Sequence, residues 1–303
     1  MICTGTLFRG IFPGGCAAPG DEYIVMPVEN GLYTRYEKLQ GIIRSLKKAA
    51  VAFSGGVDST FLLKVSLDCL GIENVIAVAA VSPSYPDAEK SEALALARSF
   101  GVRLVMVDAG EMNNPAYILN NPDRCYHCKT ELFKAIWDVI RKEGFTHILE
   151  GSNVDDLSDY RPGRKACLEA GVKSPLMEAG LSKNDIRELS ENLGLPTHNK
   201  PAQACLASRI PYGTPITADR LKRIELSEAY IRTLGISQVR VRYEGSTARI
   251  EVEPEDLPAV LAYRNEIADK LVDFGFTYVS LDLKGYRTGS MNDEIDREED
   301  GLA

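Results

Sequence analysis

The strongest constraint on the fold is a regular alternation of helical patterns and short apolar runs in the first half of the chain. The predicted elements are helix 33–46, strand 49–53, helix 60–70, strand 75–81, helix 87–100, strand 103–108, helix 132–141 and strand 146–150. Strands joined through helices pair in parallel, with helices covering both faces. The order therefore predicts an α/β fold on a doubly wound, mainly parallel sheet.

A second, smaller α/β domain is predicted beyond residue 200. Ser182 to Asp185 has the pattern of a capping box before a predicted helix over 186–193, after which Gly194, Pro196 and Pro201 break the pattern. A linker is expected between about 196 and 216. The elements predicted after it are helix 218–234, strands 238–243 and 248–252, helix 257–274 and strand 278–283. We assign residues 31–200 to the larger domain and 201–291 to the smaller one. Residues 1–30 are expected to be a disordered extension, and the acidic residues 292–303 a solvated tail.

The charge balance favours a small-molecule substrate over a nucleic acid. The 303 residues carry a formal charge of −8, whereas nucleic-acid binding depends on clustered Lys and Arg that neutralise phosphates. No run of 18 apolar residues is present, and the N-terminus lacks the pattern of a signal peptide. We therefore expect no membrane span and a cytoplasmic location.

Polar segments follow three of the predicted strands: SGGVDS after Phe53, SPSYPD after Val81 and EGSNVDD after Leu149. Because ligands of parallel sheets bind at the carboxyl ends of strands, the three segments are expected to converge on one crevice. Gly55 and Gly56 precede a helix, where backbone N–H groups can surround a phosphate. An isolated Gly-Gly pair is more often a plain turn, but strand, glycines, acidic residue, serine and helix follow in the required order.

Three of the seven cysteines form a pattern with chemical meaning. Cys125 and Cys128 are two residues apart, a spacing found in redox pairs, zinc sites and iron–sulfur sites alike. Cys205 adds a third thiol in a segment rich in Pro and small residues. Cys69 and Cys167 lie in apolar surroundings and are assigned to packing.

SGGVDS resembles the PP-loop of the N-type ATP pyrophosphatases, which split ATP between its α- and β-phosphates and adenylylate a substrate. The resemblance implies that Ser54, Gly55, Gly56, Asp58 and Ser59 bind the phosphates of ATP, with Asp58 contacting Mg²⁺. The segment beginning at Glu150 and Gly151 resembles a second loop of the same pocket.

Together with the PP-loop, the segments ACLASRIPYG and DLKGYRTGSMN make residues 31–292 similar to the LarE family. That family acts as a homo-oligomer and converts the carboxylates of pyridinium-3,5-biscarboxylate mononucleotide to thiocarboxylates for a nickel-pincer cofactor. Cys205 matches the family cysteine that gives up its own sulfur. The arginines expected to bind the substrate's phosphate and carboxylates are Arg209, Arg287, Arg240 and Arg242.

Cys125 and Cys128 depart from the single-cysteine pattern and resemble the family branch in which three thiols hold a 4Fe-4S cluster. The expected cofactors are therefore ATP, Mg²⁺ and this cluster, with zinc or a plain dithiol as the alternatives at the cysteines. Two other enzymes remain open: a tRNA 2-thiolation enzyme with the same loop and three cysteines, and an amide-forming ATP-dependent ligase. A non-enzymatic alternative is an ATP-binding sensor with structural zinc.

Overall fold

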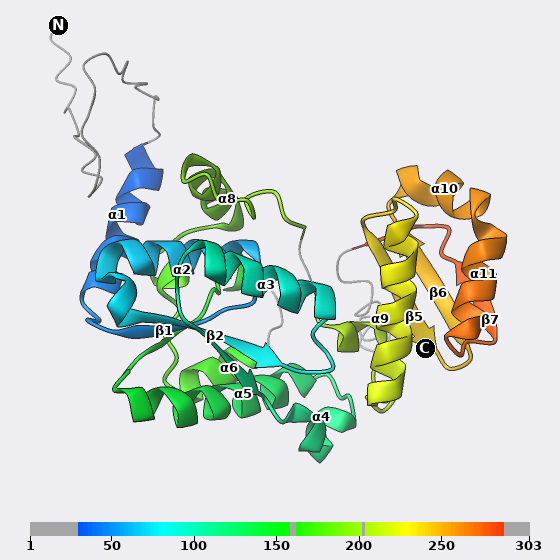
Figure 1. The fold of residues 1–303 in the computed structure, drawn as a ribbon, viewed down its shortest axis with the longest axis horizontal. Helices are drawn as coiled ribbons and strands as arrows, with labels where there is room; N and C mark the ends of the chain where they lie inside the picture. Colours follow the sequence, from blue (N-terminus) through cyan, green and yellow to red (C-terminus); the bar gives the residue numbers. More distant parts are fainter. Residues whose placement is uncertain (1–29, 158–161, 202–203, 288–303) are drawn as a thin grey trace, which may run out of the picture.

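The computed structural model describes residues 30–157, 162–201 and 204–287, and the predicted extension and acidic tail lie outside these ranges. It confirms an α/β fold with a parallel sheet and a second, smaller sheet (Figure 1). The two sheets lie on either side of the boundary predicted at residue 200, whose exact position stays a prediction. Over the described ranges, no helix combines the length and apolar character needed to cross a membrane.

The larger domain is an alternation of strands and helices. Its elements are α1 (Asn30–Arg44), β1 (Ala49–Ala52), α2 (Val57–Leu70), β2 (Val75–Val81), α3 (Asp87–Ser99), β3 (Leu104–Asp108), α4 (Pro115–Ile118), α5 (Arg124–Ile140), β4 (Ile148–Leu149), α6 (Gly163–Glu169), α7 (Pro175–Ala179) and α8 (Lys183–Asn192). Ser182 caps α8 reciprocally with Asp185, as the sequence pattern predicts.

The four strands are parallel in the order β3-β2-β1-β4. The chain leaves β1 toward β2 on one side and returns to β4 on the other, so the direction of winding reverses between β1 and β4. Such a switch point opens a crevice at the carboxyl ends of the two strands. The segments after Phe53 and Leu149 leave from this position.

Two apolar cores cover the two faces of this sheet. Helices α1, α2 and α3 lie on one face, and α5 and α6 lie on the other (Figure 1). Alternate residues of β1 divide between the cores, with Val51 in the first and Ala50 in the second. Burial on both faces explains why β1 is apolar at every position.

The smaller domain has a mixed three-stranded sheet and its own core. Its elements are α9 (Ala218–Thr233), β5 (Val239–Glu244), β6 (Thr247–Val252), α10 (Leu257–Ala262), α11 (Arg264–Asp273) and β7 (Tyr278–Leu281). Strand β6 pairs antiparallel with β5 and parallel with β7. Tyr117 of the larger domain also belongs to this core, so apolar packing joins the two domains.

Two predicted helices differ from the observed ones. Helix α5 begins at Arg124 rather than at 132, which places Cys125 and Cys128 on its first turns. The helix predicted over 257–274 is two helices, α10 and α11, that meet at Tyr263. An apolar spacing of three to four residues continues across this junction, so the pattern could not reveal the break.

Candidate functional site

A cavity of about 910 Å³ lies at the carboxyl edge of the larger sheet and extends to the smaller domain. Ser54, Tyr85 and Gly151 line it, one from each of the polar segments that follow β1, β2 and β4. The predicted convergence of the three segments is thus confirmed. The volume is sufficient for a nucleotide-sized ligand, since ligand cavities measure about 300–1,000 Å³.

The loop after β1 is shaped to receive an anion. Gly55 has a φ of 69°, and a Cβ there would lie 3.1 Å from the Cβ of Ala93 on α3. No side chain caps the start of α2 at Gly56, so the first amide groups of this helix face the cavity edge. The hydroxyl groups of Ser54 and Ser59 lie 3.1 Å apart and close the loop.

The second loop packs directly against the start of α2. A Cβ on Gly151 would come within 3.1 Å of the Asp58 Cβ and 3.2 Å of the Ser59 nitrogen. The Asn153 amide donates to Asp58 Oδ1 at 3.3 Å, and the Lys183 ammonium forms an ion pair with Asp58 Oδ2. Asp58 is therefore held at the cavity by one neutral and one charged partner, and its contact with Mg²⁺ stays a prediction.

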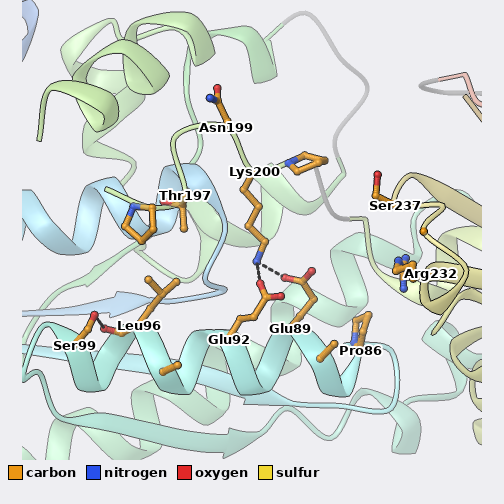
Figure 2. A pocket seen from close by; sticks show the side chains of 15 residues that line it. Pro86, Glu89, Glu92, Leu96, Ser99, Thr197, Asn199, Lys200, Arg232 and Ser237 are labelled. Carbon is orange, nitrogen blue, oxygen red and sulfur yellow. Dashed lines mark hydrogen bonds and ion pairs between the residues drawn. The ribbon is translucent and has the colours of Figure 1, made fainter. Parts of the chain in front are cut away.

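Lys200 connects the linker to the nucleotide loop. Its ammonium donates to Glu89 Oε2 and Glu92 Oε2 at 2.7 Å each and to the Gly55 carbonyl at 3.3 Å. Figure 2 shows Lys200 pointing from the 196–201 segment toward these two glutamates of α3, inside a second cavity of about 1020 Å³. Burial lowers the pKa of Lys200, but the two carboxylates outweigh it and raise the pKa overall.

The three predicted cysteines approach one another beside the main cavity. Cys125 lines this cavity, Cys128 is half-buried and packs against the interdomain core, and Cys205 is exposed. Burial raises the pKa of Cys125 and of Cys128, and the nearby charge of a Cys205 thiolate raises both further. Repulsion of this kind is relieved when a positively charged centre binds the thiolates.

The donor set suits an iron–sulfur group, although the described residues do not form a ready ligand geometry. In the part of the chain that the structure describes, no three His, Cys, Asp or Glu side chains are grouped closely enough to hold a metal ion. Three thiols from two segments nevertheless match the ligand type that such clusters require. The 4Fe-4S cluster stays a prediction.

Arg209 lies beneath the cavity rather than on its surface. It is 1% exposed and forms a two-point ion pair with Glu228, whose Oε1 lies 2.8 Å from Nε and whose Oε2 lies 3.1 Å from Nη2. The opposite side of the guanidinium donates to the carbonyls of Ala204 at 2.6 Å and Cys205 at 3.0 Å. These contacts hold the Cys205 segment in place, while binding of substrate by Arg209 stays a prediction.

The other three predicted arginines do line the main cavity. Arg242 donates hydrogen bonds to Glu251 Oε2 at 2.7 Å and to the Ser208 carbonyl at 2.8 Å. Burial and the neighbouring Arg209 lower the pKa of Arg240 to about 10. Arg287 lies 4.0 Å from Asp282. Their positive charge faces the nucleotide loop across the cavity, where an anionic substrate would be attracted.

Sequence reasoning missed Lys129, a further polar residue of the cavity. The Lys129 ammonium lies 3.6 Å from both Glu150 Oε2 and the Cys167 sulfur. Glu150 also accepts a hydrogen bond from Ser152 at 2.7 Å. Lys129 is one turn of α5 beyond Cys125, and this spacing of four residues was the signal available in the sequence.

Comparison with known proteins assigns the fold and the family. The family model for NAD synthase matches residues 37–123, which contain the SGGVDS loop. A Synechocystis protein described as uncharacterized is 44% identical over 86% of this chain and 98% of its own length. The pyridinium-3,5-bisthiocarboxylic acid mononucleotide synthase of Lactiplantibacillus plantarum is 38% identical over 87% of this chain and 96% of its own length. A Methanocaldococcus jannaschii protein, also described as uncharacterized, is 30% identical over 80% of this chain and 92% of its own.

The parallel sheet, the glycine loop before α2 and the NAD synthase match define an ATP pyrophosphatase domain of the PP-loop type. ATP use follows from this class. Similarity to the L. plantarum synthase extends through both domains, well beyond the nucleotide loop. The chain belongs to the LarE family of ATP-dependent sulfur-inserting enzymes.

Proposed function

We propose that this chain replaces carboxylate oxygen by sulfur in pyridinium-3,5-biscarboxylate mononucleotide, for nickel-pincer cofactor synthesis. The relative from L. plantarum is named for the bisthiocarboxylic acid product. The observation that carries the proposal is a single cavity lined by the nucleotide loop, Cys125 and three arginines. ATP, an anionic substrate and a sulfur centre can thus meet in one place.

The nucleotide loop activates the carboxylate. Phosphates bind the uncapped start of α2 and the Ser54–Ser59 loop, and the substrate carboxylate attacks the α-phosphorus so that pyrophosphate leaves. Magnesium would be held by Asp58, since carboxylate oxygen is its preferred ligand, and it would neutralise the charge of the phosphates. Asp155 and Asp156 line the same cavity and offer further oxygen ligands.

The arginines of the smaller domain hold the substrate. Arg240, Arg242 and Arg287 line the side of the cavity contributed by the smaller domain. A guanidinium matches both phosphate and carboxylate groups through two parallel hydrogen bonds. We assign these side chains to the mononucleotide phosphate and to the carboxylate that is not reacting.

Sulfur then attacks the carbonyl carbon of the acyl-adenylate, a C–S bond forms, and AMP departs with the electrons of the C–O bond. Cys125, Cys128 and Cys205 would hold a 4Fe-4S cluster, which supplies an iron coordination site for inorganic sulfide. Cys125 and Cys128 lie on the first turns of α5, and this pair of thiols in addition to Cys205 supports the assignment over a Cys205 that is consumed in each reaction. We further propose that the enzyme acts as a homo-oligomer.

Anaerobic purification followed by iron, sulfide and intact-mass analysis tests the sulfur donor. A brown protein with about four irons per chain and an unchanged mass after turnover is expected for the cluster. A colourless protein that becomes lighter by one H₂S during the reaction would identify Cys205 as the sacrificial donor instead. Full sulfur transfer by Cys205→Ala would exclude both routes.

A further inference from the structure

The proposed sulfur centre takes its thiols from two segments that are far apart in the sequence and must lie close together in the fold. The inference drawn below rests on this proposed function. Cys125 and Cys128 begin α5, whereas Cys205 belongs to a segment about eighty residues later. The Cys205 segment is anchored on one side, where the Leu206 amide donates to the Ser84 carbonyl at 2.9 Å. Anchoring on the other side sets how far the third thiol lies from the first two.

Asn120 provides that second anchor. This residue lies five positions before Cys125 and is fully buried. Its side-chain amide nitrogen donates to the carbonyls of Ile210 at 3.2 Å, Pro211 at 2.8 Å and Thr214 at 3.0 Å. One amide group thus binds the three carbonyls that follow the Cys205 segment and shares its two hydrogens among them.

The two oxygen atoms of Asn120 also accept hydrogen bonds. Its side-chain oxygen accepts a hydrogen bond from Arg124 Nη1 at 2.6 Å, and its backbone carbonyl accepts one from the Gly213 amide at 3.1 Å. Arg124 is the residue directly before Cys125, and its guanidinium lies 5.0 Å from the ring centre of Tyr212. The contacts of Asn120 therefore connect the start of α5 with residues 210–214.

The backbone of Asn120 is adapted to this position. Its φ is 57°, in the left-handed region where asparagine is one of the few tolerated side chains other than glycine. Elsewhere among the described residues, only Lys47 has a positive φ without being glycine. Both the conformation and the hydrogen bonds thus call for asparagine at this position.

We infer that Asn120 is a positioning residue for sulfur transfer, which fixes the Cys205 segment against the Cys125–Cys128 helix through five hydrogen bonds. Asn120 does not line the main cavity that contains the nucleotide loop. Its loss should separate the thiols while leaving the nucleotide loop intact. The two half-reactions of the enzyme distinguish this role from a general role in folding.

The test compares Asn120→Gly and Asn120→Asp with the wild type and with Asn74→Ala. Glycine keeps the left-handed backbone but removes the amide group, while aspartate keeps the shape and presents oxygen to three carbonyls. Asn74 is a matched control, because its amide also donates to a carbonyl, that of Leu70 at 2.9 Å, outside the segments that carry Cys125, Cys128 and Cys205. Single-turnover pyrophosphate release and thiocarboxylate formation are measured for each full-length protein.

We expect pyrophosphate release within about twofold of the wild type and thiocarboxylate formation lower by about tenfold or more in both Asn120 variants, since small misplacements of reacting groups have effects of this size. Equal loss of both half-reactions, or normal sulfur transfer by Asn120→Gly, would overturn the inference. An absence of thiocarboxylate formation in the wild type would instead refute the proposed function, and normal transfer by Cys205→Ala would refute the role of Cys205 on which the inference rests.

Discussion

The nucleotide loop and the arginine network of the smaller domain prepare for anionic ligands by opposite means. The loop relies on backbone amides, two glycines and a helix start without a side-chain cap. It therefore needs few charged side chains to bind phosphate. In the smaller domain Arg209 and Arg242 are already paired with the buried carboxylates of Glu228 and Glu251. A site made of backbone binds through geometry, whereas a site made of side chains first needs a framework that neutralises them.

This difference explains why the smaller domain carries so many buried charges. Glu228 accepts hydrogen bonds from Arg209, from Arg232 at 2.9 Å and from the Val241 amide at 3.1 Å. Arg249 Nη1 donates hydrogen bonds to Glu251 Oε1 at 2.8 Å and to Asp282 Oδ2 at 2.6 Å. Each carboxylate fixes arginines whose side chains support or border the cavity, and together these ion pairs form one framework under the substrate side of the site.

The largest effect is expected where the nucleotide loop depends on a side chain. Asp58→Asn removes the negative charge that faces Lys183 and the proposed magnesium ion. Pyrophosphate release should fall by about a hundredfold or more, the scale for removal of one preorganised electrostatic contact. Asp68→Asn on the same helix, which removes an exposed pair with Lys64, is the control and should change the rate little. Normal activity of Asp58→Asn would mean that the loop works through its backbone alone.

Breaking the buried ion pairs of the smaller domain should lower the free energy of unfolding. Glu228→Ala leaves the guanidinium of Arg209 buried without its partner, and the free energy of unfolding should drop by about 3–5 kcal/mol. Asp219→Ala breaks only the exposed pair with Arg223 and should cost less than about 1 kcal/mol. Urea unfolding measures both. Equal losses in the two variants would show that burial of the Arg209–Glu228 pair carries no special weight.

Lowering the pH should also destabilise these ion pairs, by less than the substitution Glu228→Ala does. Burial alone would raise the pKa of Glu228, but Arg209, Arg232 and Arg240 together outweigh burial and lower the pKa overall. Because the folded pKa lies below the unfolded value of about 4.3, this group stabilises the fold above that value, and the contribution is lost as pH falls through the folded pKa. Stability measured against pH should therefore decline less steeply in acid for Glu228→Gln than for the wild type. Parallel curves would contradict the assignment.

The smallest effect is expected from crowding the nucleotide loop. Gly151→Ala places a methyl group 3.1 Å from the Asp58 Cβ and should raise the KM for ATP by about fivefold. Gly41→Ala is the control, since a Cβ on this residue of α1 meets nothing within 4 Å. Alanine there should stabilise the helix by up to about 1 kcal/mol and leave KM unchanged. An unchanged KM in Gly151→Ala would indicate that the two loops have room to separate.

Much of the fold could be predicted from the sequence because its signals are local. Strand β2 was predicted at its observed bounds, and the capping pair Ser182 and Asp185 was found as expected. The start of α5 was missed, because Cys125, Tyr126 and His127 give no apolar spacing at its first turn. Of the site, the nucleotide loop is the part that a motif of adjacent residues could indicate, and its binding of ATP phosphates stays a prediction.

The arginines show which features of the site could be predicted from local patterns and which could not. Arg240 and Arg242 alternate along one strand, so their shared face could be predicted, and both line the cavity. Arg209 lies only four residues from Cys205, which favoured a role in substrate binding, yet its side chain is buried against Glu228 nineteen residues away. Nothing in the local pattern marks a guanidinium as buried, because its counter-ion is brought in by packing of α9.

The sequence by itself determined the chemistry: a phosphate-binding loop, three thiols and a set of arginines, each recognisable from neighbouring residues. Only the tertiary structure decided which of these groups share a cavity and which of them serve as support. The physical reason is that loop conformation depends on adjacent backbone and side chains, whereas contacts such as Lys183 with Asp58 or Asn120 with residues 210–214 depend on how whole elements pack.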